Sequence, residues 1–238
     1  MKTKLSSEYK NSIAQNLREV RERMAEANGM GQDVTLLLAT KTVPAEAINY
    51  ATQELGVTHI GENRVQELLS KYDELEKENV NIHFIGSLQT NKVKYIIDKV
   101  CMIHSVDSVK LAAEIDRQAK KHGKIMDILV EINIGEEENK GGIAPSELEA
   151  FLEELTRFDN IRVRGLMTIA PFWCEKADYQ KYFTKTYQFF IDILPKKIHN
   201  IYKPVLSMGM SDSFDTAIEC GSTLVRLGTV VFGHRQYK

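Results

Sequence analysis

Short apolar runs alternate along the chain with longer segments in which apolar and polar residues recur at helical spacing. The short runs are rich in β-branched residues and lie at 34–40, 57–61, 82–86, 101–106, 126–134, 161–169, 204–210 and 223–228. The helical segments lie at about 44–55, 62–79, 90–99, 107–122, 146–158, 175–194 and 212–220, behind a long charged helix at about 7–28. Apolar runs of this length predict buried strands, and the periodic segments predict amphipathic helices.

This alternation predicts an α/β fold with a parallel sheet, because parallel strands need crossover connections. The strand count favours a single (β/α)8 TIM barrel over residues 1–238, with the N-terminal helix as an extra element. A doubly wound open sheet is the alternative, but no GxGxxG motif follows the first strand. The Gly-rich, acidic stretch 135–142 is expected to form a loop on one rim rather than a linker between domains.

The composition argues against several classes of partner. Lysine and arginine total 31 against 33 aspartate and glutamate, without a basic stripe, so nucleic acid is not expected as a partner. Cys101, Cys174 and Cys220 lie far apart without metal-ligand spacing, which favours packing roles in a reduced, cytoplasmic protein. We expect no signal peptide and no membrane span, because the N-terminal segment lacks an apolar core and no long apolar run occurs. A monomer is expected rather than an obligate oligomer.

Lys41 directly follows the first apolar run, at a position where barrel enzymes carry functional residues. Two environments are open to such a lysine: water, or a partly desolvated mouth of the barrel. Desolvation lowers the pKa of a lysine because burial penalises the charged form, and a neutral amine can attack an aldehyde. Position alone favours the solvated alternative.

A candidate anion site lies after the seventh and eighth strands, where TIM barrels often bind phosphate. Ser211 is expected to cap the helix at 212–220, and Gly228 and Thr229 are expected to begin a further short helix. The alternative is that Ser211 only caps its helix and Gly228 only turns the chain. Their occurrence together at these two strands favours a phosphate site.

Arg226 lies inside an otherwise apolar strand, so its charge needs a partner. An inward-facing guanidinium could meet a ligand ring nitrogen or a carboxylate, and a structural ion pair with Glu131 is an equally weighted alternative. Asn63, after the second strand, could reach a ligand hydroxyl or serve as a helix cap. His83 and His104 are expected to be hydrogen-bonded core residues.

Six segments, in this order, resemble the pyridoxal-phosphate homeostasis protein family, known as YggS or PROSC. They are ATKTVP, IGENRVQE, IHFIGSLQTNK, GLMTIAP, LSMGMSDSFDTAI and GSTLVRLGTVVFG, and they span nearly the whole chain. The resemblance implies the barrel of fold-type III enzymes, as in the N-terminal domain of alanine racemase, with pyridoxal 5'-phosphate (PLP) as a covalent aldimine.

The resemblance also assigns roles to single residues. It implies that Lys41 forms the Schiff base and that Arg226 faces the pyridine nitrogen. It implies that Asn63 lies near the ring and that the phosphate is bound by Ser211, Gly228 and Thr229. Arg64 departs from the family, in which tyrosine is common at this position, so any contact made by that side chain is in doubt.

We expect a non-catalytic protein of vitamin B6 homeostasis that holds PLP reversibly and passes it to apo-enzymes. The chain ends soon after Gly233, leaving no further domain to supply a second catalytic base, and a charged Arg226 would weaken PLP as an electron sink. A PLP-dependent amino-acid racemase is the competing hypothesis, and a cofactor-free Schiff-base aldolase is a third. Lys140, in the 135–142 loop, is expected to be a surface lysine or a secondary, transient acceptor of the aldehyde.

Overall fold

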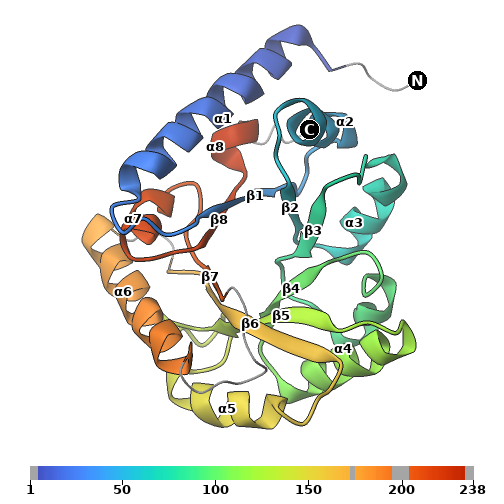
Figure 1. Ribbon diagram of the computed structural model, residues 1–238, viewed down its shortest axis with the longest axis vertical. Coiled ribbons are helices and arrows are strands. Elements are labelled where there is room, and N and C mark those ends of the chain that lie inside the picture. Colours follow the sequence, from blue (N-terminus) through green and yellow to red (C-terminus); the bar gives the residue numbers. More distant parts are fainter. Residues whose placement is uncertain (1–4, 172–174, 195–203, 234–238) are drawn as a thin grey trace.

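The computed structural model describes residues 5–171, 175–194 and 204–233, and it contains a closed parallel barrel surrounded by helices (Figure 1). The strands of this barrel, in chain order, are β1 (Thr35–Ala39), β2 (His59–Glu62), β3 (Asn81–Phe84), β4 (Met102–Val106), β5 (Met126–Ile132), β6 (Ile161–Thr168), β7 (Val205–Ser207) and β8 (Leu224–Leu227). Each strand pairs with its neighbours in the sequence, and β1 pairs with β8 to close the ring. The predicted TIM barrel is confirmed.

Helices cover the outside of the barrel. They are α1 (Ser7–Ala27), α2 (Ala45–Asn49) with a π-helical turn at Tyr50–Glu54, α3 (Val65–Lys71) with a 3-10 turn at Tyr72–Glu74, α4 (Val109–Lys121), α5 (Leu148–Leu155) after a 3-10 turn at Pro145–Glu147, α6 (Lys176–Ile193), α7 (Phe214–Glu219) and α8 (Thr229–Phe232). The segment predicted as a helix at 90–99 is a 3-10 helix, Thr90–Tyr95. The helix predicted to start at 62 begins at Val65, because Glu62 still pairs in β2.

Successive residues of each strand point alternately out toward the helices and into the barrel. Side chains that point outward, such as Leu38, Val225 and Leu227, join the large apolar layer between barrel and helices. Leu37 and Leu224 alternate with them and pack together on the other face of the sheet. Arg226 is two residues from Leu224 and therefore shares its face, which places the guanidinium inside the barrel.

The N-terminal helix α1 packs beside α7 and α8 (Figure 1). Its buried residues Ile13, Leu17 and Val20 recur at helical spacing and form its apolar, inward face. The hydroxyl of Tyr9 donates to the Phe232 carbonyl at 3.0 Å, so α1 also satisfies a carbonyl of the short helix α8. No helix in the described ranges is long and apolar enough to cross a membrane.

Of the cysteines expected to be packing residues, Cys220 is partly buried and Cys101 is exposed. Cys101 stands just before β4, outside the strand's buried run, which explains why it is not packed. Cys174 lies outside the described residues.

Candidate functional site

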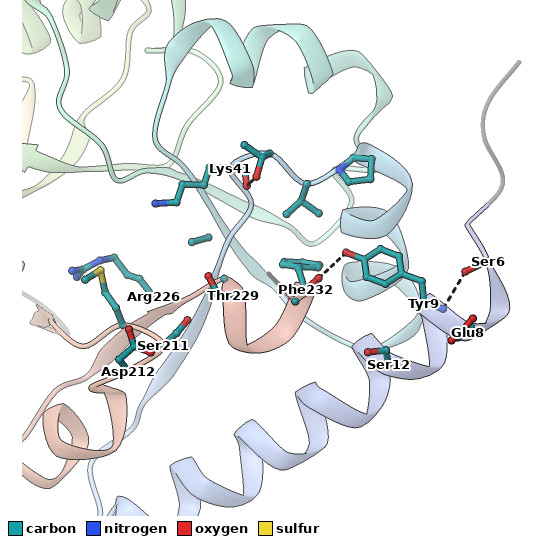
Figure 2. Close-up of a pocket in the computed structure, with 17 residues that line it drawn as sticks. Ser6, Glu8, Tyr9, Ser12, Lys41, Ser211, Asp212, Arg226, Thr229 and Phe232 are labelled. Carbon is teal, nitrogen blue, oxygen red and sulfur yellow. Dashed lines mark hydrogen bonds between the residues drawn. The ribbon is translucent and has the colours of Figure 1, made fainter. Parts of the chain in front are cut away.

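A pocket of about 1060 Å³ opens where β1, β7 and β8 end. Its walls come from the loop after β1, the turn after β7, the β8–α8 junction and the first turns of α1 (Figure 2). Five of the predicted site residues line it: Lys41, Ser211, Arg226, Gly228 and Thr229. The carboxyl ends of parallel strands bring these residues together although Lys41 and Arg226 are far apart in the sequence.

Lys41 leaves the end of β1 with an exposed side chain, at the mouth of the pocket. In Figure 2 its amine and the Arg226 guanidinium extend toward the same side of the pocket. Of the two environments considered for this lysine, the structure supports the solvated one, although the amine still faces the pocket.

Arg226 is held by neutral groups. Its Nη1 donates to Ser207 Oγ at 2.6 Å and its Nη2 donates to the Thr168 carbonyl at 2.9 Å. Burial lowers the pKa of Arg226 to about 10, against an opposing effect of Glu131, so the side chain stays charged at neutral pH. The alternative of a direct ion pair with Glu131 is not formed, because both hydrogen bonds of Arg226 go to uncharged oxygen atoms. Glu131 attracts the guanidinium only at longer range.

Three histidines continue this network through the barrel. His104 Nδ1 lies 3.2 Å from Ser207 Oγ, and His104 Nε2 lies 2.9 Å from His83 Nδ1. His83 Nε2 in turn lies 2.9 Å from His59 Nδ1. The expectation that His83 and His104 are hydrogen-bonded core residues is confirmed. Sequence reasoning missed His59 and Ser207, although both stand on apolar strands where an inward polar side chain needs a partner.

Glu131 lies near the carboxyl end of β5 and is partly buried. Burial, reinforced by Asp107, raises the pKa of Glu131 to about 7, while the charge of Arg226 opposes the shift. The carboxyl group is therefore easier to protonate than an ordinary glutamate, which weakens its compensation of the Arg226 charge.

The turn after β7 contacts the start of α8. The Val230 N–H donates to Ser211 Oγ at 3.4 Å, so Ser211 connects the two loops expected to bind an anion. The prediction that Ser211 caps the following helix is wrong: α7 begins at Phe214, and Ser213 occupies its N-cap position. Ser213 also accepts a hydrogen bond from the Met210 N–H, which closes the turn before the helix can start.

Asn63 follows β2 but is not among the residues that line the pocket. Its Oδ1 is buried and has no hydrogen-bond partner within the described protein. A Cβ on Gly86 would lie 2.2 Å from the Asn63 carbonyl oxygen, so only glycine fits behind this residue. Arg64 is exposed, and Lys140 forms an ion pair with Glu137 at 2.5 Å in the loop after β5, away from the pocket lining.

The sequence matches known families over most of its length. Residues 10–236 match the family described as alanine racemase, N-terminal domain. The curated pyridoxal phosphate homeostasis protein of Aquifex aeolicus is 44% identical over 217 residues, which cover 91% of this chain and 94% of that protein. The protein of the same name from Escherichia coli K12 is 35% identical and covers 95% and 98%, respectively. The chain belongs to the pyridoxal phosphate homeostasis protein family.

Two solved structures show the extent of the structural likeness. PipY of Synechococcus elongatus PCC7942, solved with PLP bound, has a TM-score of 0.81 at 33% identity, covering 93% of this chain and 100% of that one. Diaminopimelate decarboxylase of M. jannaschi has a TM-score of 0.72 at 16% identity, covering 93% of this chain but 60% of that one. The second likeness shows the barrel fold alone.

Proposed function

We propose that this protein binds PLP reversibly, as a Schiff base on Lys41, and serves cytoplasmic vitamin B6 homeostasis without catalysing a reaction of its own. The observation that carries the proposal is that Lys41, Arg226 and the two loops that contain Ser211 and Thr229 line one pocket. The PLP seen in PipY, at 33% identity, supports the same ligand here. We propose in addition that reversible binding allows the protein to pass PLP to apo-enzymes that need it.

The residues present fit the chemical groups of PLP. The amine of Lys41 suits the aldehyde, and the Ser211 hydroxyl with the backbone N–H groups at the start of α8 suits the phosphate. The resemblance to the family assigns Asn63 to the ring, and its Oδ1 has no partner in the described protein, although the residue lies outside the pocket lining. The charged Arg226 can donate to an unprotonated ring nitrogen.

The covalent step requires little of the protein. An unprotonated Lys41 amine attacks the aldehyde carbon, a carbon–nitrogen double bond replaces the carbonyl, and the oxygen leaves as water with both amine protons. An exposed Lys41 leaves this bond open to hydrolysis, because water reaches it as readily as the ligand does. Ready hydrolysis is what a carrier needs.

Arg226 favours binding of PLP without catalysis. When bound to an enzyme, PLP stabilises carbanions through a protonated ring nitrogen. A guanidinium that is still charged at neutral pH disfavours that proton, since two adjacent positive charges repel. The same residue that holds the ring therefore weakens the electron sink that catalysis would use.

The test compares purified wild-type protein with Lys41→Ala after addition of PLP. We expect the absorbance of a Schiff base in the wild type and its loss in Lys41→Ala, while Lys110→Ala, a change of an exposed lysine on α4, keeps it. Borohydride reduction and peptide mapping should place the adduct on the Lys41 peptide. An adduct found only on other lysines contradicts the proposal.

The racemase hypothesis is motivated by the match to the alanine racemase N-terminal domain family. Its discriminating test is exchange of the α-proton of alanine or serine in deuterated water by the PLP-loaded protein. We expect exchange no faster than with free PLP and lysine. Exchange at enzymic rates, abolished by Lys41→Ala, would replace the carrier proposal with an enzyme.

A further inference from the structure

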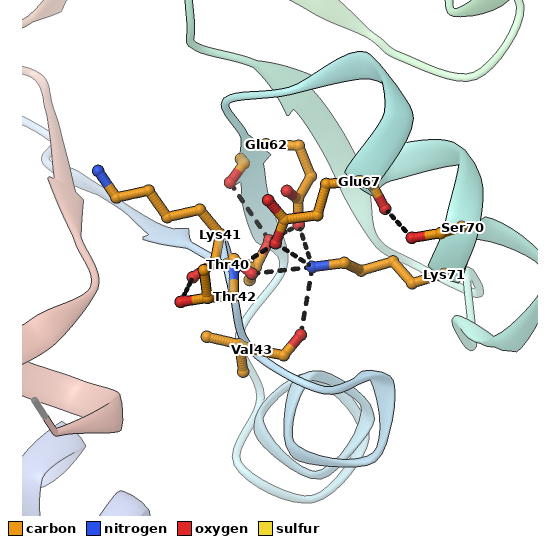
Figure 3. Close-up of polar contacts among 9 residues, drawn as sticks. Thr40, Lys41, Thr42, Val43, Glu62, Glu67, Ser70 and Lys71 are labelled. Carbon is orange, nitrogen blue, oxygen red and sulfur yellow. Dashed lines mark hydrogen bonds and ion pairs between the residues drawn. The ribbon is translucent and has the colours of Figure 1, made fainter. Parts of the chain in front are cut away.

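Behind the loop that carries Lys41, a second lysine is buried. Lys71, the last residue of α3, is 8% exposed and directs its amine at the loop (Figure 3). The Nζ donates to the Thr40 carbonyl at 3.0 Å and to the Val43 carbonyl at 3.2 Å. A single ammonium group thus binds the backbone on both sides of Lys41.

Two carboxylates complete the cluster. Lys71 Nζ lies 2.9 Å from Glu62 Oε1 and 3.1 Å from Glu67 Oε1. Glu62 also accepts from the Thr40 hydroxyl at 2.5 Å, and Glu67 accepts from the Thr42 N–H. The side chains of Lys71, Glu62 and Glu67 therefore contact three of the four residues in the Thr40–Val43 loop.

The loop needs such support because its conformation is strained. Thr42, directly after Lys41, has a φ of 64°, in the left-handed region that a β-branched residue rarely adopts. A turn of this kind persists only when surrounding contacts determine it. The contacts that hold this turn also hold the backbone of Lys41, and therefore the point from which its side chain extends.

We propose that Lys71 is a positioning residue, which fixes the Thr40–Val43 turn so that the Lys41 amine extends into the pocket on the side of the Arg226 guanidinium. This inference rests on the proposed function at Lys41. Lys71 itself is packed against β2 and the back of the loop, and it is not among the residues that line the pocket. Its effect on PLP is therefore indirect, through the backbone.

Another lysine provides a matched control. Lys124 Nζ also donates to two backbone carbonyls, those of Ile97 at 3.0 Å and Val100 at 3.1 Å, but in the segment before β4, which does not line the pocket. Replacing either lysine with methionine removes an ammonium group and leaves two carbonyls without that donor, and Lys71→Met also leaves Glu62 and Glu67 without their cation. Both variants are expected to lose stability, whereas only Lys71→Met should alter the chemistry of Lys41.

The experiment measures two ligands on the full-length wild type, Lys71→Met and Lys124→Met. PLP reports Schiff-base formation by absorbance, and pyridoxine 5'-phosphate, which lacks the aldehyde, reports binding to the phosphate and ring sites alone. In Lys71→Met we expect the rate and equilibrium constant of Schiff-base formation to fall about tenfold to a hundredfold, because small misplacements of a reacting group have effects of this size. Affinity for pyridoxine 5'-phosphate should change less than about threefold.

Hydrogen exchange of the unliganded protein tests the turn without any cofactor. The peptide containing Thr42 should exchange faster in Lys71→Met than in the wild type or Lys124→Met. If Lys71→Met does not fold, Glu67→Ala removes the acceptor for the Thr42 N–H from a partly exposed position and should show the same pattern.

The outcomes separate the two proposals. A wild-type protein that forms no Schiff base overturns the proposed function and this inference together. A normal wild type with equal Schiff-base formation in Lys71→Met overturns the positioning role alone. The positioning role is also overturned if Lys71→Met weakens Schiff-base formation and pyridoxine 5'-phosphate binding equally. It is overturned as well if Lys124→Met weakens Schiff-base formation as much as Lys71→Met does. Either result indicates general destabilisation.

Discussion

The Arg226 guanidinium donates to the Ser207 hydroxyl inside the barrel, across a distance of 2.6 Å. A guanidinium can only donate, so Ser207 Oγ accepts this bond and can donate its own proton to His104 Nδ1. In that arrangement His104 carries its proton on Nε2 and donates to His83, which donates in the same way to His59. This assignment of tautomers satisfies every contact of the network with three neutral imidazoles.

Ser207→Ala should destabilise the protein out of proportion to the atoms removed. The variant leaves Arg226 Nη1 and His104 Nδ1 buried without their shared partner, and an unsatisfied buried donor costs about 1–3 kcal/mol. Urea unfolding should show this decrease in the free energy of unfolding. Ser70→Ala, at an exposed position on α3, should change it by less than about 0.5 kcal/mol. Equal effects would mean that the network contributes nothing to stability.

His83 should make the protein sensitive to mild acid. Burial, with a smaller contribution from His59, lowers the pKa of His83 to about 3, whereas an unfolded histidine titrates near ~6.5. Between these values the unfolded chain binds the extra proton, so stability is full above about pH 6.5 and is lost as the pH falls toward 3. The expected slope is about 1 kcal/mol per pH unit for this residue.

The measurement is urea unfolding at pH 7.5 and pH 5 for wild type and His83→Asn. Glu131 has the opposite slope, because its pKa is raised to about 7 and its contribution is lost as the pH rises through that value. Glu131 is present in both proteins, so its contribution to the pH dependence cancels when wild type and His83→Asn are compared. We expect the wild type to lose more stability than His83→Asn on acidification, and identical losses would contradict the assignment.

The barrel and the ends of the pocket could be predicted because their signals are local. The pattern that predicts a strand extends over only a few residues. The geometry of the barrel then places Lys41 at the rim and Arg226 in the interior of the same pocket. The start of α7 was misplaced because Ser211 and Ser213 are equally good caps by residue type. In the fold, Ser211 Oγ accepts a hydrogen bond from the Val230 N–H, a contact from another strand's loop, and Ser213 occupies the N-cap position.

The Lys71 cluster could not be predicted for a similar reason. A lysine at the end of an amphipathic helix normally reaches water, and nothing near Lys71 in the sequence indicates burial. Its partners Thr40 and Val43 come from the preceding strand–helix unit. Contacts of this kind depend on how two units pack, which residue patterns within each unit do not encode.

Arg226→Gln should change the protonation of bound PLP. Removing the guanidinium removes the repulsion that disfavours a proton on the ring nitrogen, so that nitrogen should become easier to protonate. The 15N chemical shift of ring-labelled PLP, followed against pH, measures this directly. We expect an unprotonated nitrogen at neutral pH in the wild type and a higher pKa of the ring nitrogen in Arg226→Gln. A protonated nitrogen in the wild type would remove the electronic basis for a carrier.

Gly228→Ala should weaken phosphate binding through the backbone. A Cβ at this position would lie 2.9 Å from the Ala39 carbonyl oxygen, so the end of β8 and the end of β1 must move apart. The displacement separates the β8–α8 junction from the loop of Lys41, and we expect affinity for pyridoxine 5'-phosphate to fall about tenfold or more. Gly29→Ala is the control, because a Cβ there meets nothing within 4 Å. Unchanged affinity in Gly228→Ala, measured by calorimetry, would place the phosphate elsewhere in the pocket.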